Sequence, residues 1–255
     1  MDRLQDLEAN LHIDEHCYDF ERNENGSVSH IEFFDPEYWE FPAIESNILE
    51  ALSNYTELES ITINIHNYVL KDISHLRNFK KLKSFDIEDG LCDIDDLSVF
   101  SELKDLEFIN FYGPKITDLS PLKYLSKLKS IVIYGSCIED IKPLSTLESL
   151  EILSLNQANI KDITPIADLK NLKSLALDKN EISDISILAN HPNLIHLYLS
   201  ANKIEDISAL KPLNNLTNIG LSHNKIKDTS ALKEKKNLNY LDIQHNQISD
   251  ISFSK

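Results

Sequence analysis

A phrase of 22 residues returns along most of this 255-residue chain. A leucine recurs every 22 residues from position 106 to position 238, and two more extend the series upstream at intervals of 24. A strict period of this length indicates stacked copies of one small unit that cannot bury its apolar face alone. The leucines of the series are Leu58, Leu82, Leu106, Leu128, Leu150, Leu172, Leu194, Leu216 and Leu238.

Each copy reads L-x-x-L-x-L-x-x-N-x-I-x-D-I-x-x-L. The L-x-L pair alternates with a period of two and predicts a short strand with one buried face. Stacked copies would align these strands in a parallel sheet, about 4.8 Å apart. We expect the asparagine amide to bond backbone groups of its own and the next copy, and the aspartate to cap a short helical segment. The asparagine is present as Asn180, Asn202, Asn224 and Asn246.

This pattern resembles the leucine-rich repeat family, and its N-x-I-x-D-I-x-x-L form is similar to the repeats of bacterial internalins and of the leucine-rich regulatory subunit of protein phosphatase 1. The resemblance covers residues 58–255. It implies an α/β solenoid with a curved parallel sheet on the concave face and short helical or 3-10 segments on the convex face. The resemblance says little about function.

The two ends of the chain depart from the repeat. Residues 1–57 are expected to form an acidic cap, with a helix followed by an atypical first repeat; residues 58–255 then form a solenoid of about nine repeats, the last one truncated. That last repeat ends without the capping motif or further domains of the relatives, so its strand would be an exposed edge. Either Phe253 folds back over this edge or another chain covers it, and a homodimer is one of the open alternatives.

Charge and composition narrow the kind of partner. The net charge is −17, and residues 1–57 hold fifteen acidic residues against two arginines. Phosphate binding needs a basic patch, so we expect no nucleic-acid partner. No apolar run approaches the roughly 18 residues that span a bilayer, and the N-terminus has acids where a signal peptide needs bases. We expect a cytoplasmic protein without a membrane partner, although removal of a signal would leave a similar sequence.

The sequence offers little for catalysis or cofactor binding. With five glycines in the whole chain there is no glycine-rich phosphate loop, and no nucleophile with an orienting base is recognisable. Cys17, Cys92 and Cys137 are too scattered for a disulfide framework or a zinc ribbon. His12 and His16 have ligand spacing if they lie on a helix, but no second ligand pair accompanies them. We therefore expect no enzyme activity, no cofactor and no metal.

A binding site is expected where strand side chains point away from the core, on the concave face. Aromatic rings there combine large contact area with a polar tip, as at protein hot spots, although aromatics also simply suit strands. His223 and His245 occupy equivalent positions and should stack side by side. The candidate contact residues are Phe108, Asn110, Tyr112, Val132, Tyr134, His196, Tyr198, His223, Tyr240, Asp242 and His245, with an acidic cluster of Asp86, Glu88 and Asp89.

These observations favour a non-catalytic module that binds another protein on the concave face, and the acidity favours a basic partner. Two alternatives stay open. The chain could be an inhibitor or immunity-type protein that neutralises a toxic enzyme, or a scaffold that associates with itself through its last strand.

Overall fold

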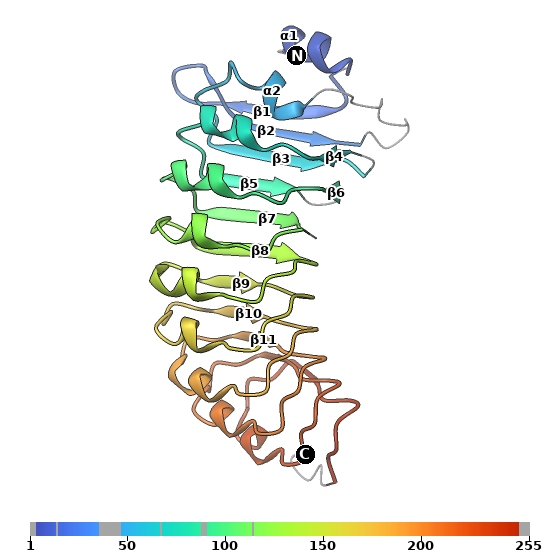
Figure 1. Cartoon of the computed structure of the whole chain (residues 1–255), viewed down its shortest axis with the longest axis vertical. Coiled ribbons are helices and arrows are strands. Elements are labelled where there is room, and N and C mark those ends of the chain that lie inside the picture. Colours follow the sequence, from blue (N-terminus) through green and yellow to red (C-terminus); the bar gives the residue numbers. More distant parts are fainter. Residues whose placement is uncertain are drawn as a thin grey trace.

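The computed structural model describes residues 4–13, 15–35, 47–66, 68–87, 91–113 and 115–249, with the backbone alone at 91 and 92. Figure 1 shows an elongated stack of similar coils with the two ends of the chain at opposite ends of the stack. Expectations that concern Glu88, Asp89 and Phe253 fall outside the described residues.

One long sheet runs the length of the stack. Its strand order is β1-β2-β3-β5-β7-β8-β9-β10-β11-β12-β13, and every neighbouring pair is parallel except β1 and β2, which are antiparallel. A two-stranded sheet of β4 and β6 lies beside it. The strands are β1 Tyr18–Arg22, β2 Val28–Phe34, β3 Ser60–Asn64, β4 Val69–Leu70, β5 Ser84–Ile87, β6 Leu91–Cys92, β7 Phe108–Tyr112, β8 Ser130–Tyr134, β9 Ile152–Ser154, β10 Ser174–Ala176, β11 His196–Tyr198, β12 Asn218–Gly220 and β13 Tyr240–Asp242.

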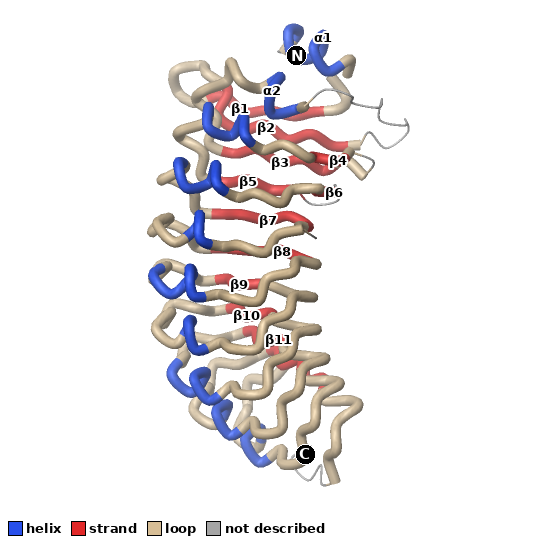
Figure 2. Tube along the Cα trace, viewed as in Figure 1, coloured by secondary structure: helices blue, strands red, loops and turns tan. Residues whose placement is uncertain are grey.

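Short 3-10 helices form a second row, one for each coil. Figure 2 shows this row stacked along one side of the molecule, with the strands along another. Two α-helices, α1 Gln5–Leu11 and α2 Ile48–Ala51, lie at the N-terminal end. The 3-10 helices are η1 Ser74–Asn78, η2 Ser98–Glu102, η3 Ser120–Leu122, η4 Lys142–Thr146, η5 Thr164–Ile166, η6 Ser186–Asn190, η7 Ser208–Leu210 and η8 Ser230–Leu232.

The repeated apolar positions form one continuous core between the two rows. In the coil that contains β10, Leu172, Leu175 and Leu177 are fully buried, and Ile182 and Leu188 complete the same layer. Full burial of one such side chain stabilises the fold by about 1.5–3 kcal/mol. Since each coil contributes an equivalent apolar layer, the 22-residue period is the length of chain that adds one layer to the core.

The aspartate of each repeat caps the 3-10 helix that follows it, as the sequence predicts. Asp184 accepts a hydrogen bond from the Ser186 N–H at 2.8 Å, and Asp206 accepts the same bond from Ser208 at 2.8 Å. The bond from the Ser186 backbone lowers the pKa of the Asp184 carboxyl. Because only the ionised carboxylate is the full-strength acceptor, each cap favours the folded state above the ordinary titration range of aspartate.

The asparagines of the last four repeats form a ladder, but its direction differs from the expectation. Asn202 donates to the Leu177 carbonyl at 2.9 Å and accepts from the Ile182 N–H at 3.0 Å, and both partners belong to the preceding coil. The same amide also donates to the Leu199 carbonyl of its own coil at 3.1 Å. The expected bond to the next coil was wrong because these backbone groups of each coil point forward along the stack, where the next asparagine lies.

An antiparallel hairpin begins the sheet at the N-terminal end. β2 pairs with β1 on one side and runs parallel to β3 on the other, so it is the first strand in the direction of the solenoid. Above it, α1 buries Leu7 and Leu11. The Tyr18 hydroxyl donates to the Glu8 carboxylate at 2.7 Å and accepts from the Leu4 N–H at 3.0 Å, which ties this helix to β1.

Candidate functional site on the solvent face of the long sheet

The candidate site is the face of the long sheet that points away from the core, called the concave face below. Strand register decides which side chains meet on it. Between β7 and β8, Phe108 lies opposite Ser130, Asn110 opposite Val132, and Tyr112 opposite Tyr134. The two tyrosines are therefore direct neighbours, although 22 residues separate them in the chain.

An aromatic patch, defined as Phe108, Tyr112, Val132, Tyr134 and Ile152, covers the strands β7, β8 and β9. Phe108 is 43% exposed, Tyr112 40%, Tyr134 42% and Ile152 40%, while Val132 is half-buried. Side chains of this size rarely gather on the surface without a partner. Four of the five were among the sequence candidates, and Ile152 lies at the equivalent strand position.

A glycine shapes this patch. Gly135 follows β8 with a φ of +68°, a conformation that residues with side chains rarely adopt. A Cβ atom built on Gly135 would overlap the Tyr112 ring, so that ring lies directly over the glycine backbone. Because Gly135 has no side chain, the Tyr112 ring can pack directly against the backbone of the sheet at this point.

Further candidates lie toward the C-terminal end of the same face. Tyr240 is 48% exposed, while Tyr198 and His196 are half-buried. A Cβ atom on Gly220 would lie 3.1 Å from the Tyr198 ring, so a glycine again makes room beside a tyrosine. The half-buried Asp242 accepts a hydrogen bond from the Gln244 N–H at 3.1 Å.

Acidic side chains also point out of this face. Asp86 accepts a hydrogen bond from the Asn110 amide at 2.9 Å, which brings these two candidates together. Asp178 accepts from the Ser200 N–H at 2.6 Å, yet burial raises the pKa of its carboxyl. Carboxylates at such positions would select a partner by charge.

A hollow that the sequence did not predict lies at the N-terminal end of this face. It has a volume of about 210 Å³ and combines Asp19 and Glu21 of β1 with His30 and Glu32 of β2. The His30 ring lies 3.7 Å from the Glu21 carboxylate. Because β1 runs antiparallel and stands outside the repeat, periodicity could not place its two acids beside β2.

The histidines of the last two coils stack, as the sequence predicts. The ring centroids of His223 and His245 are 4.1 Å apart and the ring planes differ by 18°. Both side chains are exposed at the corner that follows the strand. At the other end of the chain, α1 ends at Leu11, so His12 and His16 do not share a helical face. Within the described ranges, no group of three or more His, Cys, Asp or Glu side chains could hold a metal ion.

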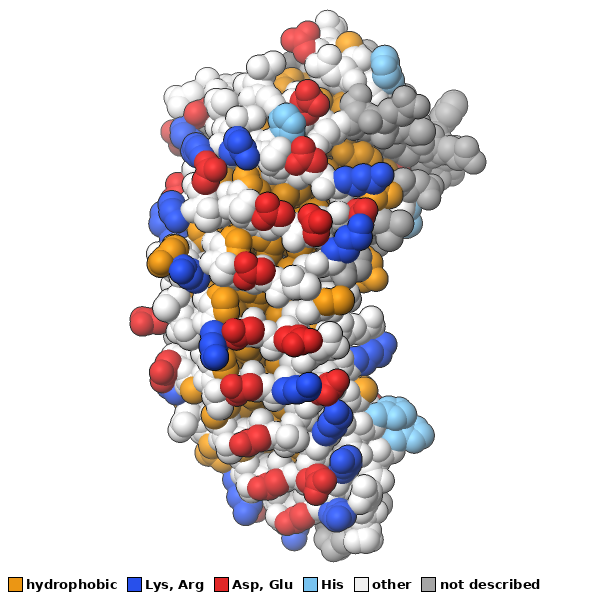
Figure 3. All heavy atoms as spheres, viewed as in Figure 1, with side chains coloured by type: hydrophobic (Ala, Val, Ile, Leu, Met, Phe, Trp, Pro, Cys, Tyr) orange, Lys and Arg blue, Asp and Glu red, His pale blue; other side chains and the backbone are white. Residues whose placement is uncertain are grey.

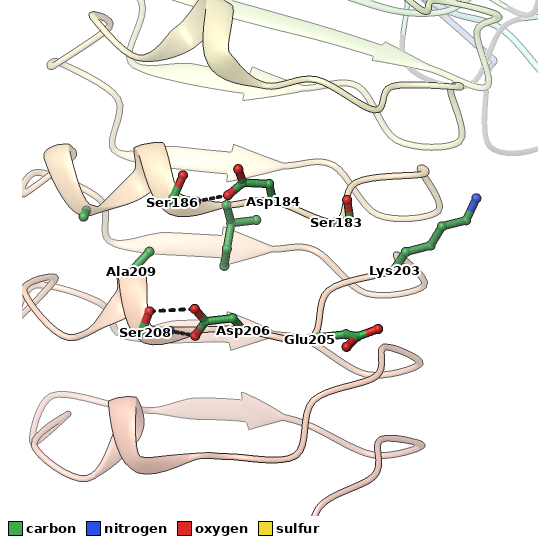
Figure 4. Close-up of a pocket in the computed structure, with 10 residues that line it drawn as sticks. Ser183, Asp184, Ser186, Lys203, Glu205, Asp206, Ser208 and Ala209 are labelled. Atoms are coloured by element: carbon green, nitrogen blue, oxygen red, sulfur yellow. Dashed lines mark hydrogen bonds between the residues drawn. The ribbon is translucent and has the colours of Figure 1, made fainter.

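Figure 3 shows one face of the stack, where acidic side chains lie in rows along the coils, with hydrophobic side chains between them and Lys and Arg side chains among them. A hollow of about 540 Å³ lies between two coils, lined by Asp184, Ser186, Lys203, Asp206 and Ala209 among others (Figure 4). Of the three carboxylates there, Asp184 and Asp206 are engaged as helix caps and Glu205 is the third, and the short side chains around them leave the space. A similar hollow lies between the coils of η1 and η2, so the shape belongs to the repeat.

Comparisons with known proteins place the chain in a class. A family model for leucine-rich repeats (two copies) matches residues 170–212, 192–234 and 214–255. An internalin (inlF) from Listeria monocytogenes is similar, at 29% identity and a TM-score of 0.76, over 98% of this chain and 70% of that one. Internalin C2 of the same organism matches at 25% identity and a TM-score of 0.62, over 88% of this chain and 91% of that one.

A plant ice-binding protein shares the fold alone, at 18% identity and a TM-score of 0.80 over 96% of this chain and 85% of that one. No curated protein matches the chain. The parallel solenoid and these matches define the chain as a leucine-rich repeat protein, and its repeats are of the internalin-like type. Proteins of this class are generally protein-binding and non-catalytic. In the part of the chain that the structure describes, no helix is long and apolar enough to cross a membrane.

Proposed function

We propose that this chain is a non-catalytic module that binds a partner protein through its concave face. One observation carries the proposal. Among the described residues, seven large hydrophobic side chains are exposed, and five of them point out of this one face. Exposed aromatic rings on a rigid sheet are typical anchors of protein interfaces. The five are Phe108, Tyr112, Tyr134, Ile152 and Tyr240.

The charge of the face supports a basic partner. Glu32, Asp86 and Asp242 occupy outward strand positions, Asp178 lies two residues after β10, and the whole chain carries a net charge of −17. Opposite charge on a partner would speed its association and reject acidic competitors.

Strong acidity and the absence of a recognisable catalytic motif in the sequence support a finer proposal, an inhibitor or immunity-type protein that neutralises a basic toxic enzyme. Its test is rescue of cells that express a toxin encoded beside this gene. Protection by the wild type, lost with the variant described below, supports the inhibitor function; failure to protect against each neighbouring product refutes it.

Self-association through β13 is a second candidate that one observation favours. β13 is the last strand of the sheet, and Leu241 and Ile243 are only partly buried, whereas the equivalent Ile219 and Leu221 are fully buried. A second copy could cover this end. A mass that stays monomeric over a wide concentration range in analytical ultracentrifugation would remove this candidate.

The main proposal is tested by affinity capture from the source cell, followed by a binding measurement with the purified partner. Wild type is compared with Tyr134→Ala/Tyr198→Ala, and with Tyr124→Ala as a matched control, because Tyr124 is 66% exposed but lies beside η3 rather than on the concave face. We expect the double variant to lose about 100-fold or more in affinity while the control binds like wild type.

The melting temperature of the double variant should stay within a few degrees of wild type, since neither ring belongs to the core. A partner retained equally by all three proteins would overturn the concave-face proposal. The search would then move to the acidic N-terminal segment or to β13.

A further inference from the structure

One column of residues in the stack has unusual backbone geometry. The third residue after the strand end takes positive φ in five successive coils, with values between 54° and 60°. Its side chain projects from the corner of the coil. The column, called the left-handed column below, consists of Gln157, Lys179, Ala201, His223 and His245.

Backbone hydrogen bonds hold this column in register. The Ala201 N–H donates to the Ser222 carbonyl at 2.8 Å, and the His223 N–H donates to the Gln244 carbonyl at 2.9 Å. The two histidines are therefore fixed as neighbours by the main chain. Their rings stack with centroids 4.1 Å apart and planes 18° apart, and both are exposed to solvent.

Two neighbouring imidazoles are the most common protein ligands for divalent transition metals. A metal–nitrogen bond is about 2.0–2.1 Å long, so one ion can join two nitrogens that lie up to about 4 Å apart. In the stack the ring planes run nearly parallel, so each ring must turn about its side-chain bonds before both lone pairs meet at one ion. Exposed side chains change rotamer on the picosecond to nanosecond timescale, so this turn is readily made.

We infer that His223 and His245 form a two-ligand site for a divalent transition-metal ion such as Ni²⁺, Cu²⁺ or Zn²⁺, with water in the remaining coordination positions. The described residues bring no third His, Cys, Asp or Glu ligand to this pair, which makes the site open and its affinity modest. Mg²⁺ prefers oxygen ligands and is excluded by the same chemistry. Simple stacking of two neutral rings is the rival account, and it requires no ion.

The test is calorimetric titration of the purified chain with Ni²⁺, and with Mg²⁺ as a negative probe. His223→Gln and His245→Gln are safe variants, because Gln157 already occupies the same column with a φ of +60°. His66→Gln removes an exposed histidine elsewhere and is the matched control. We expect one Ni²⁺ site of modest affinity per chain, weakened about tenfold or more by either column variant and unchanged in the control.

A variant that is expected to bind Ni²⁺ more tightly provides a second test. Ala201 precedes His223 in the left-handed column and has the same backbone conformation. Ala201→His would supply a third imidazole and should tighten Ni²⁺ binding, with a matching rise of the melting temperature in Ni²⁺. Wild-type binding no tighter than that of His223→Gln, or equal weakening by His66→Gln, would overturn the site and leave stacking alone.

Discussion

The solenoid is held together differently in its two halves. In the coils from residue 172 onward, called the asparagine region, each coil carries an asparagine that bonds the coil before it and is buried in every case but the partly buried Asn246. In the earlier coils, called the ion-pair region, that position holds Ser136 and Ala158, which cannot form the ladder. The Ser136 hydroxyl is buried and has no hydrogen-bond partner among the described residues.

The ion-pair region relies mainly on surface ion pairs, a kind of contact that the asparagine region adds to its ladder at Lys203 and Glu181, 2.9 Å apart. Lys83 lies 2.6 Å from Glu59, Lys127 lies 2.6 Å from Asp105, and each pair joins consecutive coils. At the repeat position of Lys127, the asparagine region has Asn193, whose amide donates to the Lys170 carbonyl of the preceding coil at 2.9 Å. The comparison teaches that the register of neighbouring coils can be specified by hydrogen bonds of buried amides or by surface ion pairs. These two kinds of contact should respond differently to mutation and to salt.

The largest effect should follow the loss of one buried amide. Asn202→Ala leaves the Ile182 N–H without its partner, while the Leu177 carbonyl keeps only its bond from the Asn180 amide at 3.0 Å. The unsatisfied N–H costs about 1–3 kcal/mol and the lost carbonyl bond about 1 kcal/mol, so the free energy of unfolding in urea should fall by about 2–4 kcal/mol. Asn193→Ala, at an exposed position, is the control and should lose less than about 1 kcal/mol. Equal losses in the two variants would remove the distinction between buried and surface bonds.

The next largest effect should be a change of folding stability with pH, which arises from a histidine in the asparagine region. His191 is fully buried where neighbouring coils have Leu169 and Leu213, and its ring nitrogens lie 2.9 Å from the Ile166 carbonyl and 3.2 Å from the Ile187 carbonyl. Burial lowers the pKa of this imidazole. Below its ordinary pKa of about 6.5 the unfolded chain takes up a proton that the folded chain resists, so stability is full above that pH and falls as the pH drops.

His191→Leu should remove this contribution. Urea unfolding of wild type and variant at about pH 7.5 and pH 5.5 isolates it, because all other titrating groups are common to both proteins. We expect wild type to lose more stability than the variant on acidification. The same loss in both proteins would show that His191 does not sense pH.

A smaller gain is expected from extending the ladder into the ion-pair region. Ala158→Asn places an amide after Gln157, whose positive φ already matches that of the residues before the existing ladder asparagines. The new amide would face the Ile138 N–H of the preceding coil. The free energy of unfolding should rise by about 1 kcal/mol in chemical denaturation. A loss of stability would mean that the alanine is there because the surrounding core excludes a polar group.

The smallest effect should come from a single surface pair. Glu107→Gln removes the partner of Lys129, which lies 2.5 Å away. Exposed pairs are worth about 0.2–1 kcal/mol, and at 1 M salt the screening length is only about 3 Å. The difference between variant and wild type should therefore nearly disappear in 1 M NaCl. A difference that survives high salt would assign the effect to packing of the Glu107 stem.

Sequence reasoning succeeded where the period is strict. The spacing of the leucines predicts the parallel strands, the buried face and the aspartate caps, because each depends on side chains within one repeat. It also predicts which side chains point outward, including Tyr134 and Tyr240, since strand side chains alternate. Whether those residues bind a partner stays a prediction.

What it missed depends on contacts between coils or outside the repeat. The direction of the asparagine ladder follows from where backbone groups of the preceding coil point, and no single repeat contains that information. The hollow at His30 needs β1, whose antiparallel course has no periodic signal. The packing of the Tyr112 ring against Gly135 depends on a close approach between two coils, and residue spacing does not reveal such an approach.

Every asparagine of the ladder bonds the coil before it, so the two ends of the stack are not equivalent. Each coil satisfies backbone groups of the coil before it, and its own equivalent groups are satisfied by the asparagine of the coil that follows. After insertion of one more 22-residue unit between Asn202 and Asn224, the new asparagine would therefore take over the bonds to Leu199 and Ile204, and Asn224 would form the same bonds with the new coil. The length of the concave face is thus adjustable in steps of one coil, and a gene could lengthen it by duplication alone.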